Sequence, residues 1–296
     1  MSEPLFGRVI PAMITPYDED KKVDHNKAKQ LVVRLIDGGS DAVLISGTTG
    51  EGPTVSYEDK MQLFRDAVEA AAGRVPIIAN VGSNDTKGSI AFARDAATTG
   101  VDALMAVVPY YNKPPQAGLY EHFKAIAAAV DLPIILYNIP GRCGVNMEAQ
   151  TTIKLARDID NIVAVKEASG NLDQIKEIID NTGDDFFVYS GDDSLTYDIM
   201  KLGGVGVITT AGNVAPDRMK EITDACAAGD FEKAREAHER FLPLMKGLFA
   251  TANPILVKEA LNLMGFYVGG VRLPLVDATP EQSKVLAEIM REVGVL

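Results

Sequence analysis

The segment from residue 42 to residue 81 decides the fold, because it holds one strand, helix and strand pattern in full. It opens with the apolar run Ala42-Val43-Leu44-Ile45 and closes with the largely apolar run Pro76-Ile77-Ile78-Ala79-Asn80-Val81. Between them, residues 57–72 place apolar side chains at spacings of three and four, as an amphipathic helix does: Met61, Phe64, Val68 and Ala71. The segment therefore predicts two strands joined by a helix.

The same alternation recurs along most of the chain. Short apolar runs lie at residues 9–14, 42–45, 76–81, 103–108, 133–137, 162–165, 186–189 and 205–208. Each run begins about 20 to 35 residues after the one before it, which is room for one strand and one helix. The runs are nearly continuously apolar, which indicates strands buried on both faces. The sequence therefore predicts an α/β fold, a (β/α)8 TIM barrel, with an open doubly wound sheet as the alternative.

The chain changes character after the eighth run. The remaining residues have a helical pattern, with one apolar stripe formed by Phe231, Ala234, His238, Phe241 and Met245. We therefore expect a catalytic barrel over residues 1–229 and an all-helical C-terminal domain over residues 230–296. His238 lies on the stripe, so a packed histidine is favoured over a catalytic one.

Composition excludes several classes of partner. The 296 residues include 41 acidic and 29 basic ones, a formal net charge of -12, and no basic stripe of the kind that binds phosphates. No apolar run approaches the ~18 residues of a membrane span, and residues 1–7 lack the features of a signal peptide. We expect a soluble cytoplasmic protein with no nucleic-acid or membrane partner.

Metal and cofactor motifs are missing from the sequence. Cys143 and Cys226 are isolated, and His25, His122 and His238 lie far apart, so no usual metal-ligand spacing exists. The sequence also lacks a Walker motif, a dinucleotide-binding glycine pattern and a G-x-S-x-G elbow. We expect no metal and no cofactor, although a metal site assembled from distant residues remains open.

Polar residues follow several of the apolar runs directly. TIM-barrel active sites lie at the C-terminal ends of the strands, so these residues are the candidates for chemistry. They occupy residues 46–51, 109–112, 137–142, 166–167 and 190–193.

Lys166 is the strongest single candidate, because it ends the apolar run at residues 162–165. Burial lowers the pKa of a lysine, and a neutral amine can attack a carbonyl to form a Schiff base. A structural ion pair is an equally good interpretation, although Glu167 is a poor partner because adjacent strand residues point to opposite faces.

Three further candidates are ambiguous when taken alone. The Gly47-Thr48-Thr49-Gly50 turn could bind a carboxylate, but threonine and glycine are ordinary turn residues. Tyr137 could carry a proton or simply belong to the barrel wall. Arg142 could clamp a carboxylate or be a surface arginine of a loop, which is the commoner case.

Together these motifs resemble a known family over the whole chain. They are Gly47-Thr48-Thr49-Gly50-Glu51, Pro109-Tyr110-Tyr111-Asn112-Lys113-Pro114, Tyr137-Asn138-Ile139-Pro140-Gly141-Arg142 and Val165-Lys166-Glu167-Ala168. The set resembles the pyruvate-dependent, Schiff-base aldolases of the N-acetylneuraminate lyase and dihydrodipicolinate synthase superfamily, and within it the dihydrodipicolinate synthases. The resemblance implies a lyase of lysine and diaminopimelate biosynthesis that condenses pyruvate with L-aspartate 4-semialdehyde.

The resemblance also implies catalytic roles and an assembly. Lys166 would form the imine with pyruvate, and Thr48 would link Tyr137 to Tyr111 in a proton relay. The Tyr111 position of the family belongs to the active site of a neighbouring subunit. A homo-oligomer is therefore implied, with a dimer as the smallest competent unit and commonly a tetramer built as a dimer of dimers.

Substrate-binding roles follow from the same resemblance. Thr49 would hold the pyruvate carboxylate, and the carbonyls of Gly191 and Ile208 would line the pyruvate site. Arg142 would bind the carboxylate of the semialdehyde, and it separates this chain from sugar-acid lyases, which generally lack an arginine there. Thr48 agrees, because neuraminate lyases usually carry serine.

Regulation is where the sequence departs from part of the family. In members inhibited by lysine, the effector contacts positions matching Tyr110 and Asn84, which are present here. Two further positions, usually a histidine and a glutamate, hold Lys60 and Gly88. The acid that would meet the ammonium of lysine is missing, so we expect weak or absent feedback inhibition.

Two other functions remain as alternatives. One is a Schiff-base aldolase or lyase acting on N-acetylneuraminate or 2-keto-3-deoxygluconate, with the same Lys166 chemistry. The other is a catalytically silent barrel that senses a small oxo acid, against which the intact Lys166, Tyr137 and Thr48 argue.

Overall fold

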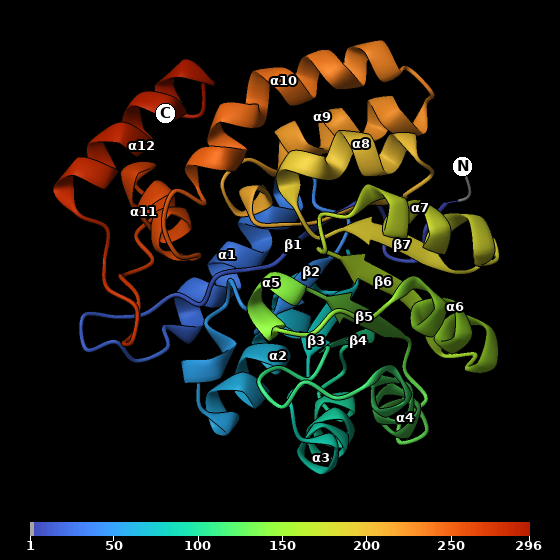
Figure 1. Ribbon diagram of the computed structural model, residues 1–296. Coiled ribbons are helices and arrows are strands. Elements are labelled where there is room, and N and C mark those ends of the chain that lie inside the picture. The colour runs from blue at the N-terminus through green and yellow to red at the C-terminus, as the bar shows by residue number, and fades with distance from the viewer. Residues whose placement is uncertain (1–2) are drawn as a thin grey trace.

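A computed structural model describes residues 3–296, and eight strands form its centre (Figure 1). They lie where the eight apolar runs predict them, with ends that differ by a few residues. The strands are β1 (Val9–Pro11), β2 (Val43–Ile45), β3 (Ile77–Asn80), β4 (Ala103–Val107), β5 (Ile134–Asn138), β6 (Ile162–Glu167), β7 (Phe187–Ser190) and β8 (Gly206–Thr209).

The strands form one parallel sheet that is nearly closed into a barrel. Their order is β1-β8-β7-β6-β5-β4-β3-β2, and every pair is parallel. A parallel bridge between Ala12 and Leu44 brings the first and last strands of this order together. The predicted TIM barrel is therefore confirmed, and the alternative of an open doubly wound sheet is wrong.

Helices follow the strands in the order that the amphipathic patterns predict. The barrel helices are α1 (His25–Asp37), α2 (Tyr57–Ala71), α3 (Thr86–Ala97), α4 (Gln116–Ala127), α5 (Pro140–Cys143), α6 (Ala149–Asp158), α7 (Leu172–Asn181), α8 (Thr196–Lys201) and α9 (Pro216–Ala227). Short 3-10 turns lie at η1 (Gly52–Thr54), η2 (Asp193–Leu195) and η3 (Ala211–Asn213). The Ser56 hydroxyl caps α2 by accepting the N–H of Asp59.

Each strand buries side chains on both faces. Ile10 and Leu44 lie in the cluster that fills the barrel, whereas Val9, Val43 and Ile45 lie in the cluster between strands and helices. This alternation explains why the strands are continuously apolar in sequence. Polar side chains inside the barrel are therefore exceptions that call for a functional explanation.

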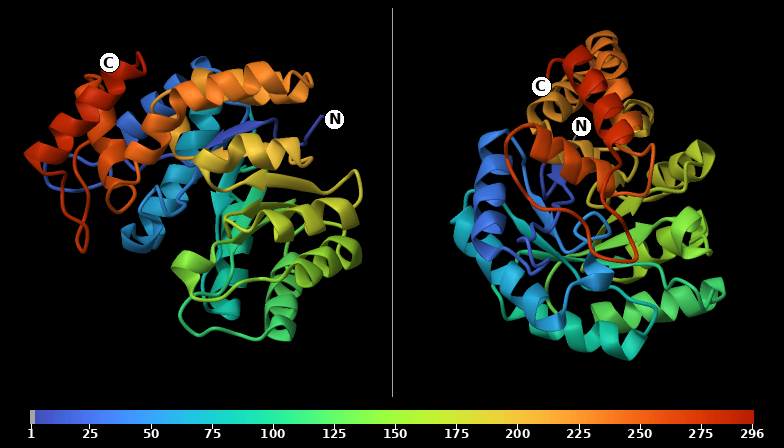
Figure 2. Two further views of the ribbon diagram at one scale, coloured as in Figure 1. Left: turned by 45° about the horizontal axis from the view of Figure 1, so that its top comes forward. Right: turned by 90° about the vertical axis from the view of Figure 1, so that its left-hand side faces the viewer.

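The C-terminal part is helical, as predicted. It contains α10 (Phe231–Gly247), α11 (Ile255–Leu263) and α12 (Pro280–Glu292), which pack against one another and against one side of the barrel (Figure 2). Phe241, Leu256 and Met290 share one continuous apolar cluster with the outer faces of the strands. The division at residue 229 falls between α9 and α10 and stays a prediction. No helix within residues 3–296 is long and apolar enough to span a membrane.

Candidate active site

Lys166 lies inside the barrel near the C-terminal end of β6. Strand register places it beside Tyr137 of β5 and Tyr189 of β7, and both tyrosines belong to the interior cluster. Its side chain points the same way, because its Nζ lies 4.4 Å from the centre of the Tyr137 ring. Only 6% of Lys166 is exposed to solvent. The amine is therefore sequestered at the end of the barrel where such enzymes carry their chemistry.

The surroundings of Lys166 favour a neutral amine. Burial lowers its pKa from 10.5 to about 8, and the guanidinium of Arg142 acts in the same direction. The carboxylate of Asp193 opposes this change. None of the ion pairs within residues 3–296 includes Lys166. The interpretation of Lys166 as half of a structural ion pair is thereby disfavoured.

Glu167 points away from Lys166, as the alternation of strand residues predicts. Its carboxylate accepts hydrogen bonds from Asn138 (3.2 Å), from the backbone N–H of Ser169 (2.8 Å) and from Gln174 (3.3 Å). Burial raises the pKa of this carboxyl, and the hydrogen bonds oppose the shift. Glu167 therefore fixes β6 against β5 and α7 and leaves Lys166 without an adjacent counter-ion.

Asp193 is the buried acid that acts on Lys166. It follows β7 and is 2% exposed. One carboxylate oxygen accepts the backbone N–H groups of Thr210 (3.1 Å) and Ala211 (2.7 Å), whereas Oδ1 has no hydrogen-bond partner among residues 3–296. Burial raises its pKa to about 6. This side chain is ionised at neutral pH and keeps one oxygen free.

The turn after β2 has an unusual backbone. The left-handed positions belong to Ser46 (φ 62°) and Glu51 (φ 52°), not to its glycines. Gly50 and Gly52 are needed for space instead, because an added Cβ would lie 2.9 Å from the Met13 carbonyl oxygen and 2.4 Å from that of Ser46 respectively. Close packing therefore explains Gly50 and Gly52, whereas a Cβ at Gly47 would meet only an ordinary contact 3.5 Å from Leu44.

A cavity of about 480 Å³ joins three of the predicted site residues. Thr48, Tyr137 and Arg142 all line it. Burial raises the pKa of the Tyr137 phenol well above its usual value, and Arg142 and a hydrogen bond with Thr48 oppose that shift. The phenol therefore stays protonated at neutral pH and can donate its proton beside the amine.

Arg142 is carried by the short helix α5 rather than by the irregular loop that the sequence suggested. Pro140 opens this helix, and the left-handed residue Gly144 ends it. The arginine side chain is largely exposed, yet it lines the cavity and its charge acts on both Tyr137 and Lys166. A cation in this place can bind the carboxylate of a ligand beside the amine.

The other predicted pyruvate contacts lie beside Lys166 and in the barrel wall. An added Cβ at Gly191 would lie 2.7 Å from the Cβ of Ala168 and 3.1 Å from Cγ of Lys166, so the glycine allows β7 to pack closely against the end of β6. Ile208 of β8 is buried in the interior cluster. Thr49 is 3% exposed, and its hydroxyl accepts a 2.8 Å hydrogen bond from Asn253.

Tyr111 is separated from the other predicted catalytic residues. It is 88% exposed and does not line the cavity, and its backbone is left-handed with φ 74°. Its N–H donates to the carbonyl of Cys143, 3.2 Å away. The described chain therefore does not bring Tyr111 to Thr48 and Tyr137.

Three of the four positions considered for regulation line the cavity, and one does not. Tyr110, Lys60 and Gly88 line the same cavity as Thr48 and Arg142. Asn84 does not line it, and its carbonyl accepts a 2.9 Å hydrogen bond from Asn112. The Lys60 ammonium lies 5.6 Å from the centre of the Phe92 ring, and burial lowers its pKa.

The sequence interpretation missed Asp193, Asn253 and Lys258. Asp193 belongs to the polar end of β7, which was noted without a role. Lys258 lies in the apolar start of α11, so the argument that singled out Lys166, a lysine in a buried run, applies to it equally. Asn253 carries no signal in a single sequence, because its contact with Thr49 spans more than 200 residues.

The chain is similar to known proteins over nearly its whole length. Residues 5–293 match the model of the Dihydrodipicolinate synthetase family. A 4-hydroxy-tetrahydrodipicolinate synthase of Symbiobacterium thermophilum is 51% identical over 99% of this chain and 100% of its own length. Among solved structures, DHDPS of Cyanidioschyzon merolae with lysine bound superposes with a TM-score of 0.97, at 45% identity and coverage of 99% and 100% of the two chains.

A third relative has been solved with a ligand. Dihydrodipicolinate synthase of Acinetobacter baumannii, chloride inhibited and complexed with pyruvate, has a TM-score of 0.96 and 39% identity, covering 98% of this chain and 100% of its own. The family match and these identities extend over nearly the whole chain. This chain therefore belongs to the dihydrodipicolinate synthetase family.

Proposed function

We propose that this chain is a 4-hydroxy-tetrahydrodipicolinate synthase, a class I aldolase-type lyase that condenses pyruvate with L-aspartate 4-semialdehyde. The family match and the named relatives support this activity over the whole chain, and they do not favour a sugar-acid lyase or a silent sensor. The observation that carries the chemistry is the buried Lys166 amine, with its lowered pKa, beside the Tyr137 ring.

Lys166 acts first as a nucleophile. Its neutral amine attacks the carbonyl carbon of pyruvate, and water leaves as the imine forms. Tyr137 donates the proton that lets the hydroxyl group leave as water, because its phenol is protonated and its ring lies beside the Lys166 amine. The Tyr137 phenolate then takes a proton from the methyl group, which converts the imine into an enamine.

The enamine carbon attacks the aldehyde of the second substrate and forms the new carbon-carbon bond, while the aldehyde oxygen takes a proton from Tyr137 and the imine with Lys166 is restored. The amino group of that substrate then attacks the imine carbon, which closes the ring and releases Lys166 as a free amine. The lysine is therefore regenerated, and no step needs an external cofactor.

Two groups hold the carboxylates of the substrates. Thr49 and the backbone beside it bind the pyruvate carboxylate near Lys166, with the carbonyls of Gly191 and Ile208 nearby. Arg142 binds the carboxylate of the semialdehyde, which its position on the cavity wall supports. An acceptor of this kind is short and acidic, unlike the polyhydroxy chain of a sugar acid.

The active unit is an oligomer in this proposal, at least a dimer and commonly a dimer of dimers. The exposure of Tyr111 supports it, because a strained and 88% exposed tyrosine gains a partner only from another chain. Thr48 then passes a proton between Tyr137 and the partner's copy of this tyrosine. The cytoplasmic location and the absence of a cofactor stay predictions.

Feedback inhibition by L-lysine is weak or absent in this proposal. A relative that shares 45% identity has been solved with lysine bound. In this chain the cavity wall presents the Lys60 cation and Gly88, so a second ammonium is repelled and finds no acid at these positions.

Borohydride reduction in the presence of pyruvate tests the proposal. We expect a pyruvyl adduct on Lys166, located by peptide mass spectrometry, and turnover when L-aspartate 4-semialdehyde is added. The Lys166→Met variant is the matched control and should give no adduct. An adduct on another residue, or none, would overturn the Schiff-base mechanism. Turnover with N-acetylneuraminate or 2-keto-3-deoxygluconate instead would overturn the proposed acceptor.

A further inference from the structure

The turn formed by residues 48–51 is held from outside by three side chains. Asn253 Nδ2 donates to Thr49 Oγ1 (2.8 Å), Thr15 Oγ1 donates to the Gly50 carbonyl (2.6 Å), and Lys258 Nζ pairs with Glu51 Oε1 (2.9 Å). Two of the three belong to residues 253–258, which lead into and begin α11. The C-terminal helical part therefore contacts this turn directly.

The contact of Asn253 sets the direction of the Thr49 hydroxyl. Asn253 is 7% exposed and Thr49 is 3% exposed, so neither exchanges this partner freely for water. Because the amide N–H donates to Oγ1, the hydroxyl hydrogen of Thr49 must point elsewhere. The Thr210 hydroxyl lies 3.4 Å away, and a carboxylate in the site would be a stronger acceptor. Asn253 therefore presents Thr49 as a hydrogen-bond donor.

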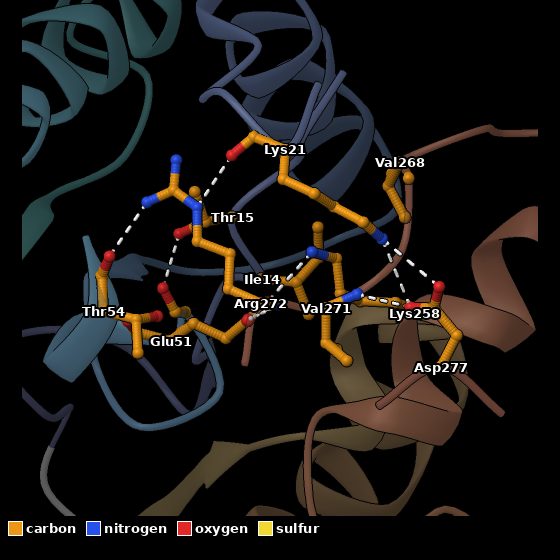
Figure 3. A network of polar contacts seen from close by, with 12 residues as sticks. Ile14, Thr15, Lys21, Glu51, Thr54, Lys258, Val268, Val271, Arg272 and Asp277 are labelled. Carbon is orange, nitrogen blue, oxygen red and sulfur yellow. Dashed lines mark hydrogen bonds and ion pairs between the residues drawn. The ribbon is translucent and has the colours of Figure 1, made fainter. Parts of the chain in front are cut away.

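The ion pair of Glu51 and Lys258 holds the far end of the turn (Figure 3). The two side chains are 2% and 1% exposed, and the ammonium lies 3.8 Å from the centre of the Tyr17 ring. The second carboxylate oxygen of Glu51 accepts the backbone N–H of Arg272 at 2.9 Å. These contacts hold the backbone of Glu51 at φ 52°, a conformation that residues with a Cβ rarely adopt.

We propose that Asn253 and Lys258 are positioning residues, which hold the 48–51 turn in the conformation that receives the carboxylate of pyruvate. They act through Thr49 and Glu51 and do not touch the reacting atoms. The inference rests on the proposed function, because it needs pyruvate to bind at this turn. It gives the helical part of the chain a function in substrate affinity.

The first test changes the hydrogen bond of Asn253. Asn253→Asp has the same shape but accepts a hydrogen bond from the Thr49 hydroxyl instead of donating one to it, and Asn253→Ala removes the contact. We expect the pyruvate concentration that half-saturates borohydride trapping of Lys166 to rise about tenfold or more, as the loss of one charge-assisted hydrogen bond implies. The aspartate variant should have the larger effect, because it adds a negative charge facing the carboxylate. Trapping at saturating pyruvate should change much less.

Asn262→Ala is the matched control. Asn262 also lies on α11, and its side chain bonds to the backbone of Gly269 (3.1 Å) and Val268 (2.8 Å), away from the turn. Its loss should lower the melting temperature without changing half-saturation by pyruvate. The control therefore separates weaker packing of α11 from a misplaced turn.

The second test neutralises the ion pair. Lys258→Met alone leaves a buried carboxylate without its partner and can prevent folding. The double variant Lys258→Met with Glu51→Gln removes both charges and keeps an oxygen for the Arg272 N–H. We expect it to fold and to need several-fold more pyruvate for half-saturation. Lys220→Met, which breaks the pair with Asp41 (2.8 Å), is the control and should leave half-saturation unchanged.

The outcomes distinguish the two proposals. No Lys166 adduct in the parent enzyme would overturn the proposed function. A parent adduct together with unchanged half-saturation in Asn253→Asp would overturn the role of Asn253 alone. An unchanged half-saturating pyruvate concentration in the folded double variant would overturn the role of Lys258 alone.

Discussion

The charge of Asp193 controls how much of Lys166 is reactive at neutral pH. With a pKa of about 8, about 9% of the amine is neutral at pH 7, against about 0.03% for an ordinary lysine of pKa 10.5. Asp193 is the acid that raises the Lys166 pKa against the effect of burial. Removing its charge should therefore lower that pKa further and increase the neutral fraction.

Asp193→Asn is the suitable perturbation, because an amide keeps an oxygen for the N–H groups of Thr210 and Ala211. The rate of imine formation at pH 7 should rise. The ceiling is about elevenfold, reached when all of the amine is neutral. Asp193 has a pKa of about 6, so the parent and the variant should converge below that pH, where residue 193 is uncharged in both proteins.

The assay measures the rate at which the pyruvate imine forms. The imine is trapped with cyanoborohydride and counted by mass spectrometry, at pH values from about 5.5 to about 10 in steps of about half a unit. Asp192→Asn is the control, since that carboxylate accepts from the backbone N–H of Ser194 and its charge raises the pKa of Asp193 rather than that of Lys166. The midpoint of the pH dependence reports the Lys166 pKa. A midpoint in Asp193→Asn that is equal to or higher than that of the parent enzyme would refute the reasoning.

Four further results are expected. Arg142→Ala should lower kcat/KM for the semialdehyde about 100-fold and imine formation with pyruvate far less, the smaller loss arising because Arg142 also helps to lower the Lys166 pKa; equal losses would contradict the clamp. L-lysine should inhibit weakly, because Lys60 and Gly88 offer no acid, and half-inhibition at submillimolar lysine in a steady-state assay would disprove this. Glu167→Ala should lower the free energy of unfolding by about 3 kcal/mol in urea titrations, because buried amides lose their acceptor. Thr49→Val should raise the pyruvate concentration that half-saturates trapping of Lys166 about tenfold, because the hydroxyl that binds the carboxylate is lost. The same half-saturating concentration in both proteins would contradict this role.

The sequence predicted the barrel because each strand is buried on two faces. Continuous apolar runs such as Ala103–Val107 and amphipathic helices such as Tyr57–Ala71 are local signals, and both elements lie where these signals place them. The short helix α5 was not predicted, because four residues carry no helical period. The left-handed positions at Ser46 and Glu51 were also missed, since contacts distant in sequence impose them.

The site was predictable to the extent that its residues follow strands. Lys166, Tyr137 and the Thr48-Thr49 turn lie at strand ends, and the structure brings them to one end of the barrel. The supports of the site come from elsewhere in the chain and cannot be found from strand ends. Asn253 contacts Thr49 across the boundary between the barrel and the helical part, and only the folded chain reveals that contact.

The cavity of about 480 Å³ has a consequence for inhibitor design. Its size lies within the range of pockets that hold drug-sized compounds, and its wall runs from Arg142 and Tyr137 to Tyr110 and Lys60. A single compound with an acid group at each end could bind Arg142 and Lys60 together, gaining from two anchors without the entropy cost of a second molecule. Such a compound would be selective, because relatives with a neutral side chain at the Lys60 position would lack the second anchor.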